Sequence, residues 1–182
     1  TMRAVPYKKS SGSTYLGQYS FKRNSGDPVH ILVSTQAKEP MFAFAHEIGH
    51  YVDQQHFDIG KALAGNNVGG DALKAWKSAV DNSAAIQHLT SLRQMKAKIV
   101  MANGAERFAD MEFARYALQY NEIWARSYAQ YIAVRSQNPA LLSELASFKE
   151  QYKSYSWQWN DDDFEPIAKA FDDLFAAKGW RK

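Results

Sequence analysis

Residues 41–57, MFAFAHEIGHYVDQQHF, contain the pattern on which the predicted fold and chemistry of this chain depend. The pattern is H-E-x-x-H, formed by His46, Glu47 and His50. On an α-helix, two residues four positions apart project from one face, one turn above the other. Two imidazoles placed in this way can bind one zinc ion, and the intervening carboxylate can reach a water on that metal. The stretch therefore predicts a metal site on a helix.

The surrounding residues favour a core helix over residues 40–55. Apolar residues recur on one side, at Phe42, Ala45, Ile48 and Val52. Gly49 lies in the middle of this helix, where glycine costs about 1 kcal/mol relative to alanine. We expect that its small size allows another backbone to approach the metal-binding face.

Composition indicates a globular protein. The 182 residues are 46% hydrophobic and 14% aromatic, which predicts a single domain over residues 1–182 with a real core. There is no cysteine, so His, Asp and Glu are the available metal ligands. The net charge of +3 does not by itself indicate nucleic-acid binding. Residues 1–12 are expected to form a flexible arm. A basic patch in and near this arm is a weak signal for nucleic-acid binding.

The sequence contains no segment that is typical of membrane insertion. It has no apolar run of 18 or more residues and no N-terminal segment resembling a signal peptide. We therefore expect no membrane partner and a cytoplasmic or particle-associated location. Thr1 precedes Met2, which is compatible with a longer native chain.

Periodicity predicts a mainly α-helical α+β fold with a small N-terminal β-sheet. Alternating residues over 13–22 and the β-branched run 29–33 are typical of strands. A flexible loop or lid is predicted over 58–70, and a turn at Asn103-Gly104. Besides the metal helix, helices are predicted over 71–80, 83–98, 105–118, 120–136, 139–153 and 163–177.

A catalytic zinc needs a third protein ligand, and the sequence offers two candidates. The first is His56, because HEIGHYVDQQH matches H-E-x-x-H-x-x-G-x-x-H except for Asp53 at the glycine position. The second is Glu122, which shares a helix face with the small residues Ala125 and Ala129. A carboxylate flanked by small residues could pack closely against Gly49 and His50.

The blocks HEIGHYVD and EIWARSYAQYIA resemble zincin-type metallopeptidase domains of phage and prophage head-morphogenesis proteins. They are also similar, more distantly, to the catalytic domain of anthrax lethal factor. The resemblance implies a zincin-like fold in which His46, His50 and Glu122 bind zinc and Glu47 is the general base. It favours Glu122 over His56 as the third ligand, which is the gluzincin arrangement.

Three further residues are candidates for supporting roles, the first of them suggested by the resemblance. Gluzincins often use a tyrosine upstream of the glutamate ligand to stabilise the oxyanion, and Tyr116 lies near that offset. Asp53, three residues beyond His50, is a candidate acceptor for the other ring N–H of that histidine. Arg126 is a candidate partner of Glu122, Glu47 or Asp53, and a surface ion pair is the expected form.

The predicted function is zinc-dependent hydrolysis of peptide bonds, with a peptide or protein substrate. An edge strand at 29–34 is expected to pair with the extended substrate through main-chain hydrogen bonds. Phage capsid components are the partners that the resemblance suggests, and nucleic acid is not expected. The alternative is a structural or interaction module of a phage or mobile-element protein that keeps the fold with little proteolysis.

Overall fold

The structure of the chain is a computed structural model. The structure describes residues 7–10, 16–57, 70–95, 98–100, 103–108 and 111–180. The loop predicted over 58–70 lies outside these residues except for position 70, as does most of the arm predicted over 1–12. In the described part of the chain, no helix combines the length and apolar character needed to cross a membrane.

Two compact units are built from interleaved segments of the chain. The first contains residues 1–59 and 124–148, and the second contains residues 60–123 and 149–182. The division falls inside two unbroken helices, α6 (Tyr120–Ser136) and α7 (Pro139–Gln151). The described structure is mainly helical with small sheets, as predicted.

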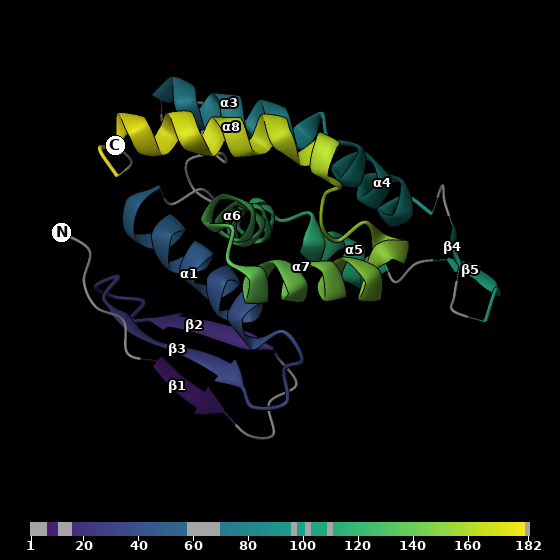
Figure 1. The fold of residues 1–182 in the computed structure, drawn as a ribbon, viewed down its shortest axis with the longest axis horizontal. Coiled ribbons are helices and arrows are strands. Elements are labelled where there is room, and N and C mark those ends of the chain that lie inside the picture. Colours follow the sequence, from purple (N-terminus) through teal and green to yellow (C-terminus); the bar gives the residue numbers. More distant parts are fainter. Residues whose placement is uncertain are drawn as a thin grey trace. The chain divides into compact units, whose positions relative to one another are not determined.

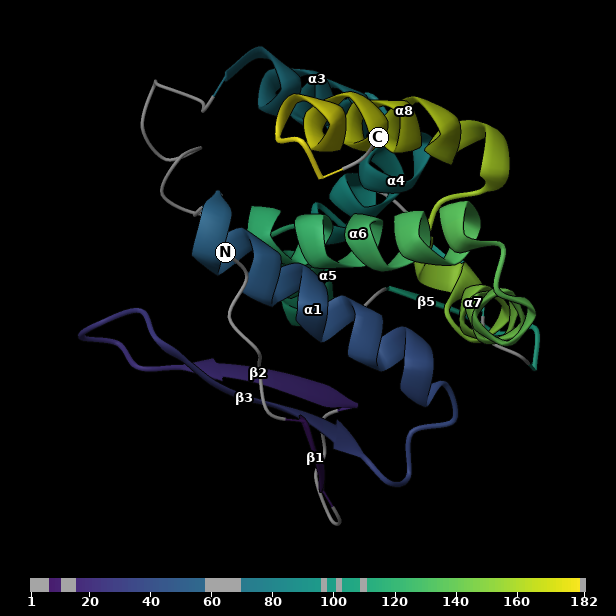
Figure 2. The same ribbon diagram turned by 60° about the vertical axis from the view of Figure 1, so that its left-hand side comes forward.

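The first unit contains a three-stranded sheet covered on one face by a helix. Strands β1 (Tyr7–Ser10), β2 (Gly17–Phe21) and β3 (Pro28–Ser34) have the order β1-β3-β2. Helix α1 (Pro40–His56) packs on β2 and β3, as Figures 1 and 2 show. Apolar side chains from the sheet and helix form the core between them, including Ile31, Val33 and Ala43.

The sheet differs from the prediction in one respect that matters for function. Strand β3 pairs with β1 in parallel and with β2 in antiparallel orientation. The strand predicted as the edge, 29–34, is therefore the central strand, and the prediction is wrong. The parallel strand β1 was not predicted, because its short basic sequence YKKS lacks an apolar alternation.

The second unit is mainly helical. Helices α3 (Gly70–Asp81) and α8 (Asp161–Ala177) lie side by side, as Figures 1 and 2 show. Helix α4 (Ala84–Arg93) packs on α5 (Met111–Ala117), and the 3-10 helix η1 (Lys153–Tyr155) contacts α4. The aromatic rings of Phe113 and Trp157 pack with centroids 4.7 Å apart.

Two predicted helices are shorter than expected because a hairpin lies between them. Helix α4 ends at Arg93 and not at residue 98, because Met95 adopts a left-handed conformation with φ of 55°. Strands β4 (Lys98–Val100) and β5 (Glu106–Phe108) follow and pair in antiparallel orientation. The turn at Asn103-Gly104 is confirmed, with φ of 79° at Gly104, but it joins two strands.

Candidate metal centre

Helix α1 places His46 and His50 as the motif predicted. It runs without a break from Pro40 to His56, with proline in its first turn, where the missing N–H costs nothing. The Nε2 atoms of His46 and His50 are 3.1 Å apart, and the rings are nearly perpendicular, at 84°. Two nitrogen ligands of one tetrahedral zinc lie about 3.3 Å apart when each bond is about 2.05 Å. The two imidazoles therefore converge on one point.

Glu122, in the first turn of α6, completes the group. One ligand atom from each of His46, His50 and Glu122 can be chosen so that all three lie within 4.8 Å of one another. The Glu122 side chain is buried, at 4% exposed. These three residues could hold a metal ion, as predicted.

Close packing between α1 and α6 explains why Glu122 reaches the histidines. A Cβ added to Gly49 would lie 2.8 Å from Cα and 3.1 Å from the carbonyl oxygen of Ala125. The indole Nε1 of Trp124 also donates to the carbonyl oxygen of Gly49 at 3.0 Å. The expectation that Gly49 lets another backbone approach is confirmed. Since α6 is unbroken, the position of Ala125 fixes that of Glu122 one turn earlier.

His56 does not join this group. It is the last residue of α1, six positions beyond His50 on the same helix, which is about 9 Å along the axis. The sharp turn that would bring a third histidine back to the metal does not form, because the helix continues through Asp53. Of the two ligand candidates, the structure brings Glu122 to the histidines.

Glu47 is buried against strand β2. Its side chain is 7% exposed, and a Cβ added to Gly17 would lie 2.7 Å from both Cγ and Oε1 of Glu47. Glycine at position 17 therefore makes room for this carboxylate. The sequence analysis did not identify Gly17, although a glycine inside a predicted strand can mark a close approach of another group.

Asp53 and Arg126 are both buried, at 6% and 0% exposed. The expected surface ion pair of Arg126 is therefore wrong. The missed signal was the composition of α6, where small and apolar residues occur on every side of the helix. Whether Asp53 orients His50 stays a prediction.

The buried charges fit a divalent cation. Helices α1 and α6 bury the carboxylates of Glu47, Asp53 and Glu122 and the guanidinium of Arg126. Burying a carboxylate is costly unless its charge is compensated, and a divalent cation between His46, His50 and Glu122 would compensate the charge of Glu122.

Tyr116, which was predicted as the oxyanion donor, and Tyr128 have different surroundings. Tyr116 lies on α5 in the second unit, is 45% exposed and stacks on Trp157 with centroids 6.3 Å apart. Its role as an oxyanion donor stays a prediction. Tyr128 was not singled out from the sequence. Its Cβ lies 3.2 Å from the position of a Cβ at Gly49, and burial raises its pKa to about 12.

Comparisons of the chain with protein families, with curated proteins and with solved structures found no match.

Proposed function

We propose that this chain is a zinc-dependent endopeptidase with a zincin-like fold. The observation that carries the proposal is the convergence of His46, His50 and Glu122, with Glu47 next to His46 on the same helix. Two imidazoles and one carboxylate form a ligand set typical of catalytic zinc, which keeps a further position open. The burial of the Glu122 carboxylate beside two imidazoles supports a divalent ion. The association with phage particles stays a prediction from the sequence resemblance.

Peptide hydrolysis needs a proton to move from water to the leaving amine. Zinc, when bound, lowers the pKa of water to about 7 and polarises a carbonyl group. As the oxygen of the attacking water bonds to the carbonyl carbon, the carboxylate of Glu47 accepts one proton from that water. The protonated Glu47 side chain then gives this proton to the amide nitrogen as the C–N bond breaks. The products are a carboxylic acid and an amine.

Strand β2 is the better candidate for substrate pairing. Among the described residues, β2 pairs only with β3, so its other edge is available for main-chain hydrogen bonds. Its residue Gly17 packs directly against Glu47. An extended peptide added along β2 would thus run beside the proposed base, as the sequence analysis had expected of strand 29–34.

Metal content tests the ligand set. The protein is loaded with zinc, dialysed against metal-free buffer and analysed by mass spectrometry for bound metal. We expect about one zinc per chain in the unmodified protein, a strong loss in Glu122→Ala, and retention in the matched variant His56→Ala. Loss of zinc in His56→Ala together with retention in Glu122→Ala would overturn the ligand assignment.

Cleavage of a peptide library tests the activity itself. We expect hydrolysis that a chelator abolishes and that zinc restores. Glu47→Gln should keep zinc and lower the rate by about 100- to 10,000-fold, because the amide cannot accept the proton. Stoichiometric zinc with no cleavage of any library peptide would instead support the structural module.

A further inference from the structure

The main chain does not require a glycine at position 17. Gly17 is the first residue of β2, and its φ angle lies outside the left-handed region, so other residues could adopt its conformation. Glycine weakens a strand, because it has no side chain to pack and loses more conformational freedom on folding than other residues do. The reason for glycine at this position therefore lies in the atoms around it.

The atoms that a side chain at position 17 would meet belong to Glu47. A Cβ added to Gly17 would lie 2.7 Å from Cγ, 2.7 Å from Oε1 and 3.1 Å from Cδ of Glu47. Favourable contacts between carbon atoms are about 3.5–4.0 Å long, so these separations are repulsive. The bare Cα of Gly17 thus lies against the Glu47 side chain, and a larger residue would push on it.

Strand β2 holds Gly17 in place on both sides. Directly before it, the carbonyl oxygen of Leu16 accepts a hydrogen bond from Ser34 N at 2.9 Å. Two residues after it, and on the same face of the strand, the hydroxyl of Tyr19 donates to Oε1 of Gln54 on α1 at 2.9 Å. The main chain at Gly17 is therefore bonded to β3 and tied to α1 close to the contact.

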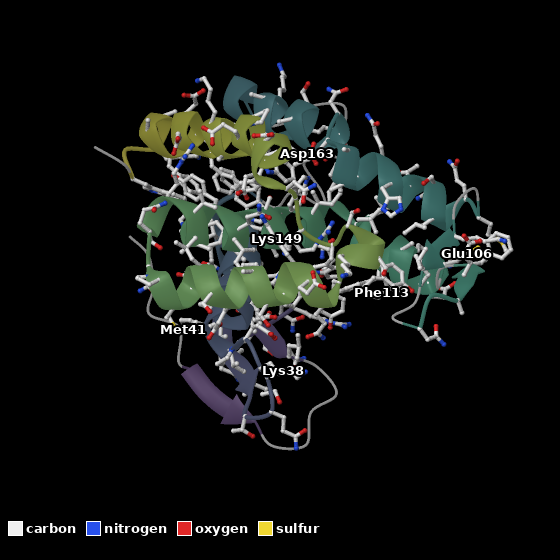
Figure 3. The ribbon with its side chains drawn as sticks, turned by 45° about the vertical axis from the view of Figure 1, so that its right-hand side comes forward. Lys38, Met41, Glu106, Phe113, Lys149 and Asp163 are labelled. Carbon is white, nitrogen blue, oxygen red and sulfur yellow. The ribbon has the colours of Figure 1, made fainter. Side chains whose placement is uncertain are left out.

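Helix α1 is held in place as well. A short segment joins β3 to α1, and Figure 3 labels Lys38 in this segment and Met41 in the first turn of the helix. Ile48, the residue after Glu47, packs against a buried cluster that includes Ile31 of β3. Because both main chains are fixed, the part that can yield to a side chain at position 17 is the Glu47 side chain.

Yielding would move the carboxylate of Glu47. Rotation about χ2 or χ3 leaves Cγ where it is, so the contact at Cγ is relieved only by rotation about χ1. Such a rotation carries the carboxylate with it, and a helix permits few χ1 values. The side chain is 7% exposed, so its neighbours restrict the alternatives further.

We propose that Gly17 is a positioning residue for the base of the proposed reaction. Its lack of a side chain lets Glu47 adopt the χ1 value that serves proton transfer. The inference rests on the proposed function, because it assigns the effect of position 17 to the role of Glu47 in peptide hydrolysis. It also distinguishes Gly17 from Gly49, where an added Cβ would meet backbone atoms of Ala125.

Steady-state kinetics of Gly17→Ala, on a peptide that the unmodified protein cleaves, test the proposal. We expect kcat to fall by about 100-fold, because a displacement of about 1 Å in a reacting group has effects of this size. KM should change by less than about twofold. Zinc content and the urea midpoint should equal those of the unmodified protein. The control Lys22→Ala removes an exposed side chain just beyond the end of β2 and should leave kcat and KM unchanged.

A double variant shows whether Gly17 acts through Glu47. Glu47→Gln has already lost the base, so adding Gly17→Ala should not lower its residual rate further. If position 17 acted through the fold or through substrate binding instead, the two losses would multiply.

The contact itself can be measured without zinc or substrate. In the metal-free protein we expect a nuclear Overhauser effect between the α-protons of Gly17 and the γ-protons of Glu47. This measurement uses the unmodified chain, so the inference remains falsifiable if Gly17→Ala fails to fold.

The outcomes separate this inference from the proposed function. An unchanged kcat in Gly17→Ala, a loss of zinc in that variant, multiplying losses in the double variant, or a missing Overhauser effect would each overturn the role of Gly17 alone. No cleavage of any peptide by the zinc-loaded unmodified protein would overturn the proposed function, and the role of Gly17 with it.

Discussion

At Gly49 the absence of a side chain sets the distance between α1 and α6. The nearest atoms to an added Cβ belong to the backbone of Ala125, at 2.8 and 3.1 Å. Backbone atoms of a packed helix move only if the helix moves. Gly49 therefore controls how close Glu122 comes to the two histidines.

Gly49→Ala should destabilise the protein, although alanine normally gains about 1 kcal/mol over glycine inside a helix. Forcing α6 away from α1 should lower the free energy of unfolding by about 1–3 kcal/mol and weaken zinc binding. Urea denaturation of the metal-free protein measures the first effect, and zinc titration measures the second. Adding Ala125→Gly should not rescue stability, because the contact is with backbone atoms. A variant as stable as the unmodified protein would contradict the packing described.

Tyr128 makes stability depend on pH in the alkaline range. Burial raises its pKa from 10.0 to about 12, so the folded state favours the neutral phenol. A folded pKa above the unfolded one stabilises the protein fully below pH 10, and this stabilisation is lost as pH rises from 10 toward 12. Tyr19, whose pKa burial also raises to about 12, contributes over the same window.

Tyr128→Phe should therefore reduce the alkaline loss of stability. The pKa difference corresponds to at most about 2–3 kcal/mol. The test is the urea midpoint of both proteins between pH 9 and about pH 11.5, with tyrosinate absorbance followed in parallel. We expect the midpoint of the variant to fall less than that of the unmodified protein as pH rises, because the variant has one fewer tyrosine to ionise. Parallel curves would show that Tyr128 ionises alike in the folded and unfolded states.

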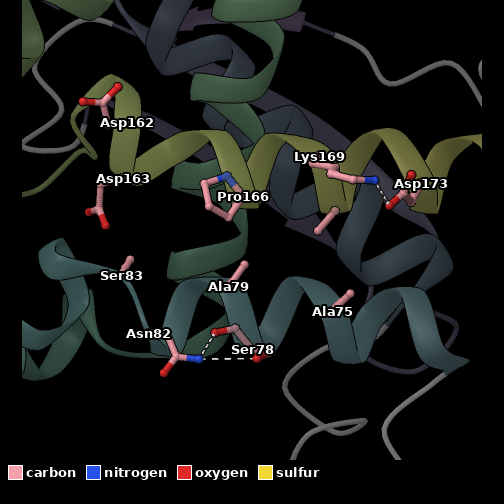
Figure 4. A pocket seen from close by; sticks show the side chains of 11 residues that line it. Ala75, Ser78, Ala79, Asn82, Ser83, Asp162, Asp163, Pro166, Lys169 and Asp173 are labelled. Atoms are coloured by element: carbon pink, nitrogen blue, oxygen red, sulfur yellow. Dashed lines mark hydrogen bonds and ion pairs between the residues drawn. The ribbon is translucent and has the colours of Figure 1, made fainter.

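At the scale of the elements, a residue of α8 caps the N-terminus of another helix, α4. Asp163 points from the start of α8 toward Ser83, where α4 begins, as Figure 4 shows. Its oxygens accept hydrogen bonds from Ala84 N at 2.8 Å and from Ala85 N at 3.1 Å. The run of residues 160–163, one asparagine and three aspartates, lies at the N-terminus of α8 itself. The cap residue there, Asn160, makes no side-chain capping bond.

Asp163→Ala should cost about 0.5–2 kcal/mol of stability, because it leaves N–H groups of α4 without their acceptor. Asp162→Ala, which removes the exposed neighbouring carboxylate, is the matched control and should have a much smaller effect. Thermal and urea unfolding measure the stability of both variants. Equal losses in the two variants would mean that the charge near the start of α8, and not the cap on α4, is what stabilises the fold.

At the scale of the whole molecule, each unit needs segments that are distant in the sequence. The first unit joins residues 1–59 to residues 124–148. Of the candidate metal ligands, His46 and His50 come from α1 and Glu122 comes from α6. A cation that binds ligands from both helices would favour the folded chain over the unfolded chain. Binding to the folded state alone stabilises a protein in proportion to the logarithm of ligand concentration.

Removing the metal should therefore lower the melting temperature. At a zinc concentration of about 1,000 times the dissociation constant, the stabilisation is about 4 kcal/mol. Calorimetry of the protein with zinc and with a chelator measures the difference. The difference in melting temperature between the two conditions should disappear in His46→Ala and persist in His56→Ala. An identical shift in both variants would place the bound metal elsewhere.

Elements whose signals are local could be predicted from the sequence alone. The H-E-x-x-H spacing placed both imidazoles on one face of α1, and the predicted bounds of α6 agree with Tyr120–Ser136. Features that depend on packing between distant segments became known only from the three-dimensional structure. It brought Glu122 and not His56 to the histidines, made 28–34 the central strand, and buried Arg126. Helical periodicity depends on residues three or four positions apart, whereas these outcomes depend on contacts between segments far apart in the sequence, such as the close approach of Ala125 to Gly49.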